Sequence, residues 1–469
     1  MLRPAHIFAV LCLAGTGSAG FAALALAQGE GSGTDNPDLL RGSYAAGCAP
    51  GTLCDFPQVD LFAPPIVRPM PLPAAPAVAP APLLPPVAAM PATLPMLPIE
   101  AGAIQPRTEW EGAYALGLRG AYVRTGSEER FELLAIPQIS FSRAAAATRY
   151  DFDANATIVA PDSSDMRLGG AGVSGTIEHR LAPGAALVFN ADLDIEQDAP
   201  DGLGVDEANV AQAPTTLSGG VSAAYGQRFG QFDLTLSAGL SNRWMEPTLL
   251  ADGTMRDNAY RSALAYEGGL RLGYAATPIL GTFVSGEIGR EDYLAADPDL
   301  LASRSGMVAS LRAGVTGNWS DVITAEASIG TSWRDYDSPL VRDAQAWLYG
   351  VSLGFAPTST TQFTAGFETE LAAGSGASGA DAVYLASLAA HHRINPWLAL
   401  RASASAQWDV PVDGSATART YGAGLGTELA IGPHASAEFD YGYGWRDDGD
   451  PAAPPRDEHR ISGGVTLRY

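Results

Sequence analysis

Residues 435–445 read ASAEFDYGYGW, and apolar and polar side chains alternate through the whole stretch. The odd-numbered positions, from Ala435 to Trp445, are Ala or aromatic, and the even-numbered positions are Ser, Glu, Asp or Gly. Successive side chains of a β-strand point to opposite faces of a sheet, whereas an amphipathic helix repeats its apolar residues every three or four positions. The stretch therefore predicts a β-strand with one apolar and one polar face.

The same alternation recurs along the chain from Trp110 to the end. It is clear in residues 232–241, 323–334 and 347–355, and again in the closing RISGGVTLRY, residues 460–469. This part of the chain has no long helical period and no apolar run of about 20 residues, which excludes a transmembrane helix. We therefore expect an all-β fold over residues 109–469.

Short turns and longer polar loops alternate between the predicted strands. The short turns fall at Leu181–Gly184, Phe229–Gly230, Thr277–Pro278, Asn318–Asp321, Pro357–Thr360, Asn395–Pro396 and Gly432–Pro433. The longer loops include residues 197–214, 245–258, 291–304 and 445–459. Transmembrane β-barrels have short periplasmic turns and longer outer loops, so the alternation predicts an up-and-down antiparallel barrel of about eighteen strands with both ends in the periplasm. Turn signals are weak before Arg180, so about sixteen strands is the alternative count.

A soluble β-sandwich or propeller would show a similar alternation. Its solvent face would be dense in charge, whereas the polar face here is rich in Gly, Ser and Thr. In lipid no strand edge can stay unpaired, so we expect the last strand to close on the first. Aromatic residues also fall near strand ends, as in the interfacial girdles of membrane barrels: Tyr225, Trp244, Tyr274, Tyr293, Trp319, Trp333, Trp347, Trp397, Trp408 and Trp445.

The region before the strands divides into three parts. Residues 1–27 have a cationic start, an apolar run and a closing Ala-Leu-Ala, which predicts a cleaved secretory signal peptide, with an uncleaved anchor helix as the alternative. Residues 28–55 hold Cys48 and Cys54, for which an oxidising compartment favours a small disulfide loop over a metal pair. Residues 56–108 are dominated by Pro and Ala, which predicts an extended periplasmic linker or a docking site for a periplasmic partner.

The chain is acidic overall. It has 51 Asp and Glu residues against 28 Lys and Arg, which gives a formal charge of -23, and every one of these cations is Arg. Nucleic-acid binding requires a basic face, so the composition argues against a nucleic-acid partner.

From about Trp110 to Tyr469 the sequence resembles the β-barrel porin families of Gram-negative outer membranes, the type 2 group in particular. The resemblance rests on recurring units of strand, short turn, strand and polar loop, as in residues 219–241, 266–293, 311–337 and 421–445. It implies an outer-membrane location in contact with lipid and lipopolysaccharide. The final Val465, Leu467 and Tyr469 look like the signal that the barrel-assembly machinery reads.

Charged residues on the polar parity are the candidate pore lining. A barrel of this width is not filled by its own wall side chains, so charges on its inner face tune which solutes pass. The alternative is that these charges only pair with one another across neighbouring strands. The predicted pore-lining residues are Asp233, Glu267, Arg271, Arg312, Glu326, Arg334, Arg401, Glu428, Glu438, Asp440, Arg446 and Arg468.

Catalysis has little support in the sequence. The adjacent His391 and His392 would point to opposite faces of a strand, so they cannot share a metal, and Ser387 on the face of His391 is expected by chance in a Ser-rich barrel. We therefore expect no enzyme, cofactor or metal. The predicted function is a porin-like channel for passive diffusion of small hydrophilic solutes; the alternatives are a barrel that exports surface polysaccharide and a structural barrel without an open pore.

Overall fold

The computed structural model describes residues 110–162, 166–205, 209–298, 300–320, 322–374, 379–449 and 454–469. The predicted signal peptide, the Cys48–Cys54 loop and the Pro/Ala-rich linker all lie outside these residues and stay predictions. No helix in the described part of the chain is long and apolar enough to cross a bilayer.

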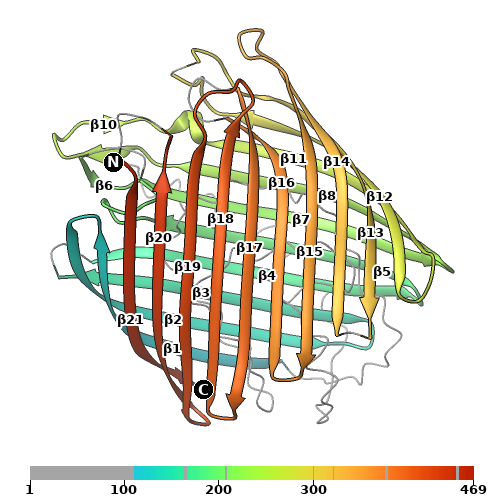
Figure 1. Cartoon of the computed structure of the whole chain (residues 1–469), viewed down its shortest axis with the longest axis horizontal. Helices are drawn as coiled ribbons and strands as arrows, with labels where there is room; N and C mark the ends of the chain where they lie inside the picture. Colours follow the sequence, from blue (N-terminus) through green and yellow to red (C-terminus); the bar gives the residue numbers. More distant parts are fainter. Residues whose placement is uncertain are drawn as a thin grey trace.

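Eighteen strands form one antiparallel sheet that closes on itself (Figure 1). They are β1 (Glu111–Thr125), β2 (Glu128–Ala144), β3 (Thr148–Pro161), β4 (Arg167–Ala182), β5 (Ala185–Gln197), β7 (Thr215–Phe229), β8 (Phe232–Met245), β11 (Ala263–Ala275), β12 (Leu280–Tyr293), β13 (Gly306–Trp319), β14 (Ile323–Tyr336), β15 (Ala344–Thr358), β16 (Thr361–Ala373), β17 (Ala380–Asn395), β18 (Leu398–Pro411), β19 (Ala418–Gly432), β20 (Ala435–Asp447) and β21 (Arg456–Arg468). The prediction of an up-and-down barrel of about eighteen strands is confirmed.

The barrel closes between the last strand and the first, as expected. β21 pairs with β1 in a continuous register from Ala115 opposite Arg468 to Thr125 opposite Glu458. Two further backbone hydrogen bonds extend this seam, from Tyr114 N to Tyr469 O at 3.0 Å and from Tyr469 N to Tyr114 O at 2.8 Å. The final residue is therefore still paired, because a free edge in lipid would leave backbone groups without partners.

The two rims differ as the turn pattern predicts. At the rim near the C-terminus the strands are joined by tight turns, such as Gly184 with φ +81° and Gly230 with φ +65°. The longer loops lie at the other rim, where β6 (Val210–Gln212), β9 (Thr248–Leu250) and β10 (Met255–Arg256) form a small separate sheet, with a 3-10 turn at Ala259–Arg261 (Figure 1). The exception is the two-residue β1–β2 turn, where Gly126 has φ +58°.

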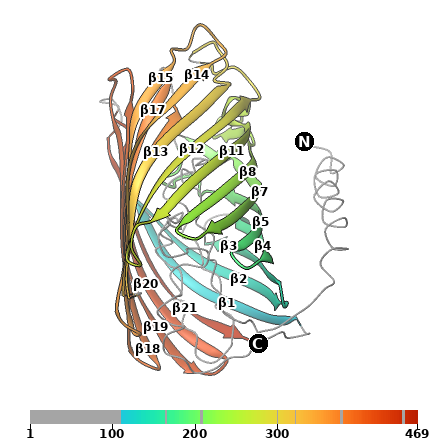
Figure 2. The same ribbon diagram turned by 90° about the vertical axis from the view of Figure 1, so that its right-hand side faces the viewer.

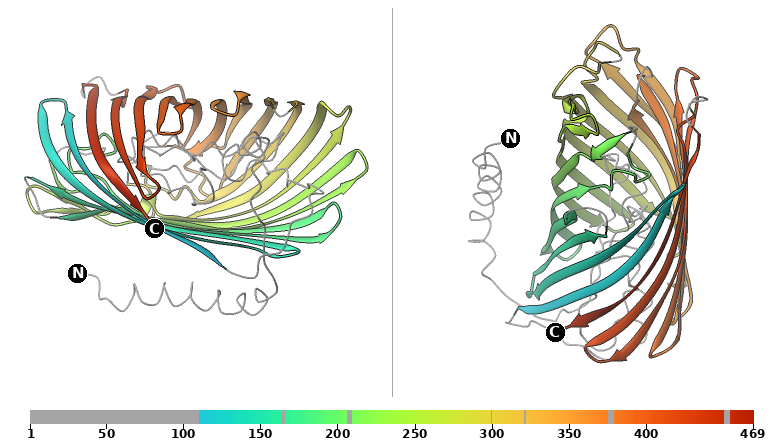
Figure 3. Two further views of the ribbon diagram at one scale, coloured as in Figure 1. Left: turned by 90° about the horizontal axis from the view of Figure 1, so that it is seen from below. Right: turned by 90° about the vertical axis from the view of Figure 1, so that its left-hand side faces the viewer.

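Strands on opposite walls run at a steep angle to each other. In Figure 1 β14 to β21 cross the front of the molecule and β1 to β8 run behind them, and Figures 2 and 3 show the same crossing from the sides and from below. This tilt is the geometry that a closed sheet requires. Because of this tilt, two residues at the same height along the barrel axis are not directly paired partners in the strand register.

The outward face is apolar and the inward face is mostly polar. Outward positions such as Leu118, Leu425 and Ile461 are exposed, whereas adjacent residues of the same strands, such as Arg119 and Arg460, are buried. Most of the predicted aromatic girdle lies outward, with Trp319, Trp333, Trp347 and Trp397 exposed. The prediction is wrong for Tyr293, which falls on the inward parity of β12. Its hydroxyl donates a hydrogen bond to Glu291 Oε2 at 3.3 Å.

Candidate pore lining

All twelve predicted pore-lining residues lie on the inward parity of their strands. Arg271 is an example, since it is fully buried between the exposed Leu270 and Leu272 of β11. Glu326, Arg334 and Glu438 are likewise almost completely buried. The alternation of apolar and polar residues therefore places these charges inside the barrel, although it says nothing about their partners.

Ion pairs run along the inner wall from β11 to β16. Each pair joins two strands that are not hydrogen-bonded neighbours. The long Arg side chain spans this distance by lying along the tilted wall. The Arg271 guanidinium also stacks 3.5 Å above the Phe283 ring of β12. The pairs are Arg271–Glu326 at 2.8 Å, Arg334–Glu291 at 2.8 Å and Arg312–Glu368 at 3.5 Å.

A second cluster of ion pairs lies beside the seam. Arg401 Nη2 contacts Asp440 at 2.6 Å and Glu438 at 3.6 Å, and Arg119 on the far side also pairs with both carboxylates. Glu428 is bound by Arg468 at 2.9 Å. The sequence analysis singled out all of these residues except Arg119, which lies in the first hairpins, where the turn signals are weak.

Glycines on the inward face make room for these pairs. Gly464 lies between Arg119 and Glu438 in the register, and a Cβ there would come within 2.6 Å of Arg119 Cγ. Gly426 lies between Arg401 and Asp440, and a Cβ there would come within 2.3 Å of Asp440 Oδ1. An Arg therefore crosses a strand over a Gly to reach an acid on the next strand. A Gly that lies in register between an Arg on one neighbouring strand and an acid on the other is the sequence signal that would have identified these partners.

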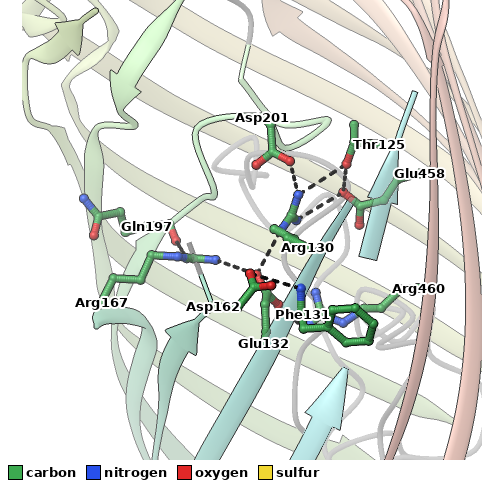
Figure 4. Close-up of polar contacts among 10 residues, drawn as sticks. All are labelled: Thr125, Arg130, Phe131, Glu132, Asp162, Arg167, Gln197, Asp201, Glu458 and Arg460. Carbon is green, nitrogen blue, oxygen red and sulfur yellow. Dashed lines mark hydrogen bonds and ion pairs between the residues drawn. The ribbon is translucent and has the colours of Figure 1, made fainter. Parts of the chain in front are cut away.

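A third cluster at the loop rim is centred on Glu132 of β2 (Figure 4). Its carboxylate accepts from Arg130 at 3.0 Å, from Arg460 at 2.9 Å and from Arg167 at 3.4 Å. Arg130 also contacts Glu458 at 3.8 Å. Three Arg and the two carboxylates of Glu132 and Glu458 leave one positive charge in excess, which Asp201 of the next loop balances.

That loop, residues 198–205 after β5, folds inward. It contacts β2 on one side of the seam and β20 and β21 on the other. Asp201 pairs with Arg130 (Figure 4), Arg446 Nη1 donates to Leu203 O at 3.0 Å, and Arg456 Nη1 donates to Val205 O at 2.7 Å. The sequence analysis placed these residues in an ordinary outer loop and identified no inward-folded segment. Contacts between residues 243 and 251 positions apart cannot be read from local spacing.

The inner wall formed by β3 and β5 carries carboxylates without cations. Asp153 and Asp192 both pair in register with Ser174 of the strand between them, and Asp194 lies two residues further along. No described residue forms an ion pair with any of these three Asp residues. Gly172 keeps the wall open here, because a Cβ would lie 2.6 Å from Asp194 Oδ1.

The remaining predicted residues have simple placements. Val465 and Tyr469 are exposed, and Leu467 is half-buried on the outward parity of β21. His391 lies on the inward parity of β17 and His392 on the outward parity, where its Nδ1 is 2.9 Å from Thr361 Oγ1. Within the described ranges, no group of three or more His, Cys, Asp or Glu side chains could hold a metal ion.

Several solved structures are similar to this chain. OpdK from Pseudomonas aeruginosa covers 76% of this chain and 99% of its own length at 12% identity, with a TM-score of 0.39. OccAB4 from Acinetobacter baumannii covers 76% and 98% at 10% identity, with a TM-score of 0.38. The FrpB iron transporter from Neisseria meningitidis covers 76% and 81% at 8% identity, with a TM-score of 0.40. No curated protein matches the chain.

The family comparison covers most of the barrel. The model described as Putative beta-barrel porin 2 matches residues 139–469, from within β2 to the last residue. The match agrees with the closed eighteen-stranded sheet and its apolar outward face. The protein lies in the outer membrane of a Gram-negative bacterium, in contact with lipid and lipopolysaccharide, and the chain belongs to the Putative beta-barrel porin 2 family.

Proposed function

We propose that the protein is a channel through which small hydrophilic solutes diffuse passively across the outer membrane, and that it is not an enzyme. The observation that carries the proposal is the charged inner wall of an eighteen-stranded barrel. Barrels of sixteen to eighteen strands are wide enough to leave an aqueous channel, and charged groups on an inner wall need water or partners. Reconstitution in a planar bilayer tests the proposal, because a channel gives discrete, stable current steps.

The unpaired carboxylates of β3 and β5 set the preference of this channel. Arg271, Arg312 and Arg334 on the inner wall from β11 to β16 each pair with an acid, so their positive charges attract anions only weakly. Asp153, Asp192 and Asp194 have no such partner among the described residues, and a ring or wall of carboxylates favours cations. The proposed channel is therefore weakly selective for cations.

Neutralising two of these carboxylates should reduce the selectivity. For Asp192→Asn/Asp194→Asn we expect the ratio of K⁺ to Cl⁻ permeability to fall by about twofold or more, because two charges are removed from the inner wall. The reversal potential under a KCl gradient measures this ratio. Asp252→Asn, at an exposed position of the loop between β9 and β10, is the control. An unchanged reversal potential in the double variant would show that this wall does not line the ion path.

The closing residues of β21 serve assembly in this proposal. Val465, Leu467 and Tyr469 face outward at the end of the seam, where the assembly machinery must bring the two edge strands together. Deleting Tyr469 removes two backbone hydrogen bonds and the exposed aromatic, so we expect a severalfold loss of folded barrel in cell envelopes. Any barrel that does assemble should conduct normally. Envelope yields equal to those of the full chain would contradict this role.

A further inference from the structure

The outward face of the barrel has an open pocket at Ala365 of β16, on the wall formed by β14 to β17 (Figure 1). The pocket has a volume of about 300 Å³, and its lining exposes only apolar atoms. We call it the Ala365 pocket. Its lining includes Leu353 and Phe355 of β15, Phe363 and Ala365 of β16, and Leu388 of β17.

The strand register explains why the wall is hollow at this point. Ala365 pairs with Leu353 on one side and with Leu388 on the other, and Phe363 and Phe367 flank it on the same face of its own strand. One small side chain is therefore surrounded by four larger ones. Leu353 and Leu388 are 42% and 52% exposed, so the pocket is open on the side that faces the bilayer.

Polar groups lie between the pocket and the periplasmic rim. Phe355 and Phe363 stack with ring centroids 6.0 Å apart, and they line the end of the pocket nearest this rim. Two residues closer to the rim, on the same face, Thr361 pairs with the exposed His392, and Thr361 Oγ1 lies 2.9 Å from His392 Nδ1. From Thr361 to Ala365 the strand rises by about 13 Å.

The chemistry of the pocket fits a hydrocarbon chain. Side chains around an empty pocket lose dispersion contacts on the empty side. Inside a bilayer no hydrophobic force brings two apolar surfaces together, so close packing decides what binds. A flexible acyl chain can fill an apolar pocket of this size. The hydroxyl of Thr361 and the imidazole of His392 can form hydrogen bonds with the headgroup that such a chain carries.

We propose that the Ala365 pocket binds one acyl chain of a phospholipid from the periplasmic leaflet, and that Thr361 and His392 contact its headgroup. Trp397, which is exposed at the same rim, agrees with a position of this rim at the membrane interface. The occupant is a phospholipid and not a second barrel, because the pocket is continuous with the surface that faces lipid. A stable protein interface would need on the order of 1,000 Å² of complementary surface. The site does not depend on the proposed channel function.

Photo-cross-linking of the full-length protein tests where the acyl chain lies. The protein would be reconstituted in vesicles of phosphatidylethanolamine and phosphatidylglycerol that contain a phosphatidylethanolamine with a diazirine in one acyl chain. After photolysis we expect severalfold more label at Ala365 and Leu388 than at Leu236. Leu236 is the control because it is exposed on the outward face of β8, four residues from the start of its strand, as Ala365 is on β16. Equal labelling would show ordinary contact with lipid and would overturn the site.

Filling the pocket tests the binding itself. Ala365→Trp should lower the phospholipid retained by the purified barrel severalfold, because the indole occupies the pocket; native mass spectrometry measures the retained lipid. Ala238→Trp, at an exposed outward position of β8, is the matched control and should retain it. Heat-modifiable mobility shows whether both variants fold. Equal retention in Ala365→Trp and the unsubstituted protein would overturn the proposal. A paired barrel that Ala365→Trp separates, with no change in lipid, would identify a second copy as the occupant and would also overturn it.

Replacing the polar pair at the rim tests the position of the headgroup. Thr361→Val/His392→Leu removes both hydrogen-bonding side chains and leaves the Ala365 pocket intact. We expect severalfold less retained phospholipid by the same measurement. Unchanged retention would overturn the assignment of the headgroup to these two residues.

Discussion

Gly464→Val is expected to prevent the barrel from closing. Gly464 lies on the inward parity of β21 opposite Arg119 of β1, and a Cβ there would come within 2.3 Å of the Leu118 carbonyl oxygen. Backbone at this distance cannot yield as a flexible side chain can, so the two edge strands must move apart. The larger side chain would also displace Arg119 from Glu438. Two edges left open in lipid expose backbone groups at several kcal/mol each, so we expect nearly complete loss of the folded form.

The matched control lies in the same seam. Gly120 of β1 pairs with Gly463 and points outward, where a Cβ would meet nothing within 4 Å. Gly120→Val should therefore fold normally, because its side chain only adds apolar surface against lipid. Heat-modifiable mobility on a gel measures the folded fraction of both variants. A folded Gly464→Val barrel in normal amounts would show that β1 and β21 do not close the cylinder in this register.

Arg271→Ala is expected to destabilise the folded barrel by about 3–5 kcal/mol, the usual cost of leaving one partner of a buried ion pair. Arg271 and Glu326 both have fully buried side chains, and their closest contact is 2.8 Å. Removing the cation leaves the Glu326 carboxylate buried with one strong partner fewer, and it also removes the guanidinium that covers Phe283. Denaturant unfolding of the reconstituted barrel, followed by tryptophan fluorescence, measures the change.

Two further variants separate the ion pair from general packing. Arg271→Met/Glu326→Leu removes both charges, and it should recover most of the lost stability, because well-packed apolar residues often replace a buried pair without cost. Arg290→Ala breaks an exposed pair with Asp337 at the loop rim, and it should leave the stability unchanged. If the double replacement is as unstable as Arg271→Ala, the loss comes from packing and not from an unpaired charge.

Alternation along single strands was enough to predict the architecture. The period-2 pattern and the short turns between strands predicted the strand number, the closing seam and the inward direction of all twelve charged residues. These properties are local, because the parity of a strand residue decides which face it joins. The inward Tyr293 shows the limit of reading residue type alone, since an aromatic near a strand end belongs to the girdle only if its parity is outward.

Contacts between distant strands could not be predicted in the same way. Arg271 meets Glu326 three strands away because the strands are tilted, and the offset depends on the closed geometry of the whole barrel. The inward loop depends on Arg446 and Arg456, which follow it by more than two hundred residues. The cluster of inward apolar residues on β1 to β3 was missed because these strands lie in the first hairpins, where the turn signals are weakest; it consists of Ala121, Val123, Leu134, Ile136 and Val159.

The sequence allowed two roles for the inward charged residues, namely selecting solutes and forming ion pairs with one another. The structure divides them between walls. Arg271, Arg312 and Arg334 have acidic partners, so their charges mainly hold the wall together. Asp192 and Asp194 face inward without an ion pair to any described residue, and only such groups are available to a passing ion. Solute selection is therefore expected to depend on inward carboxylates of this kind, with those of β3 and β5 among them.

Planar-bilayer recording from the purified full-length protein tests the channel function most directly. We expect discrete and stable current steps in KCl, with a reversal potential that indicates a weak preference for cations. Heat-modifiable mobility of the same preparation shows whether the barrel is folded. A folded, inserted barrel that carries no current would contradict the assignment of a channel.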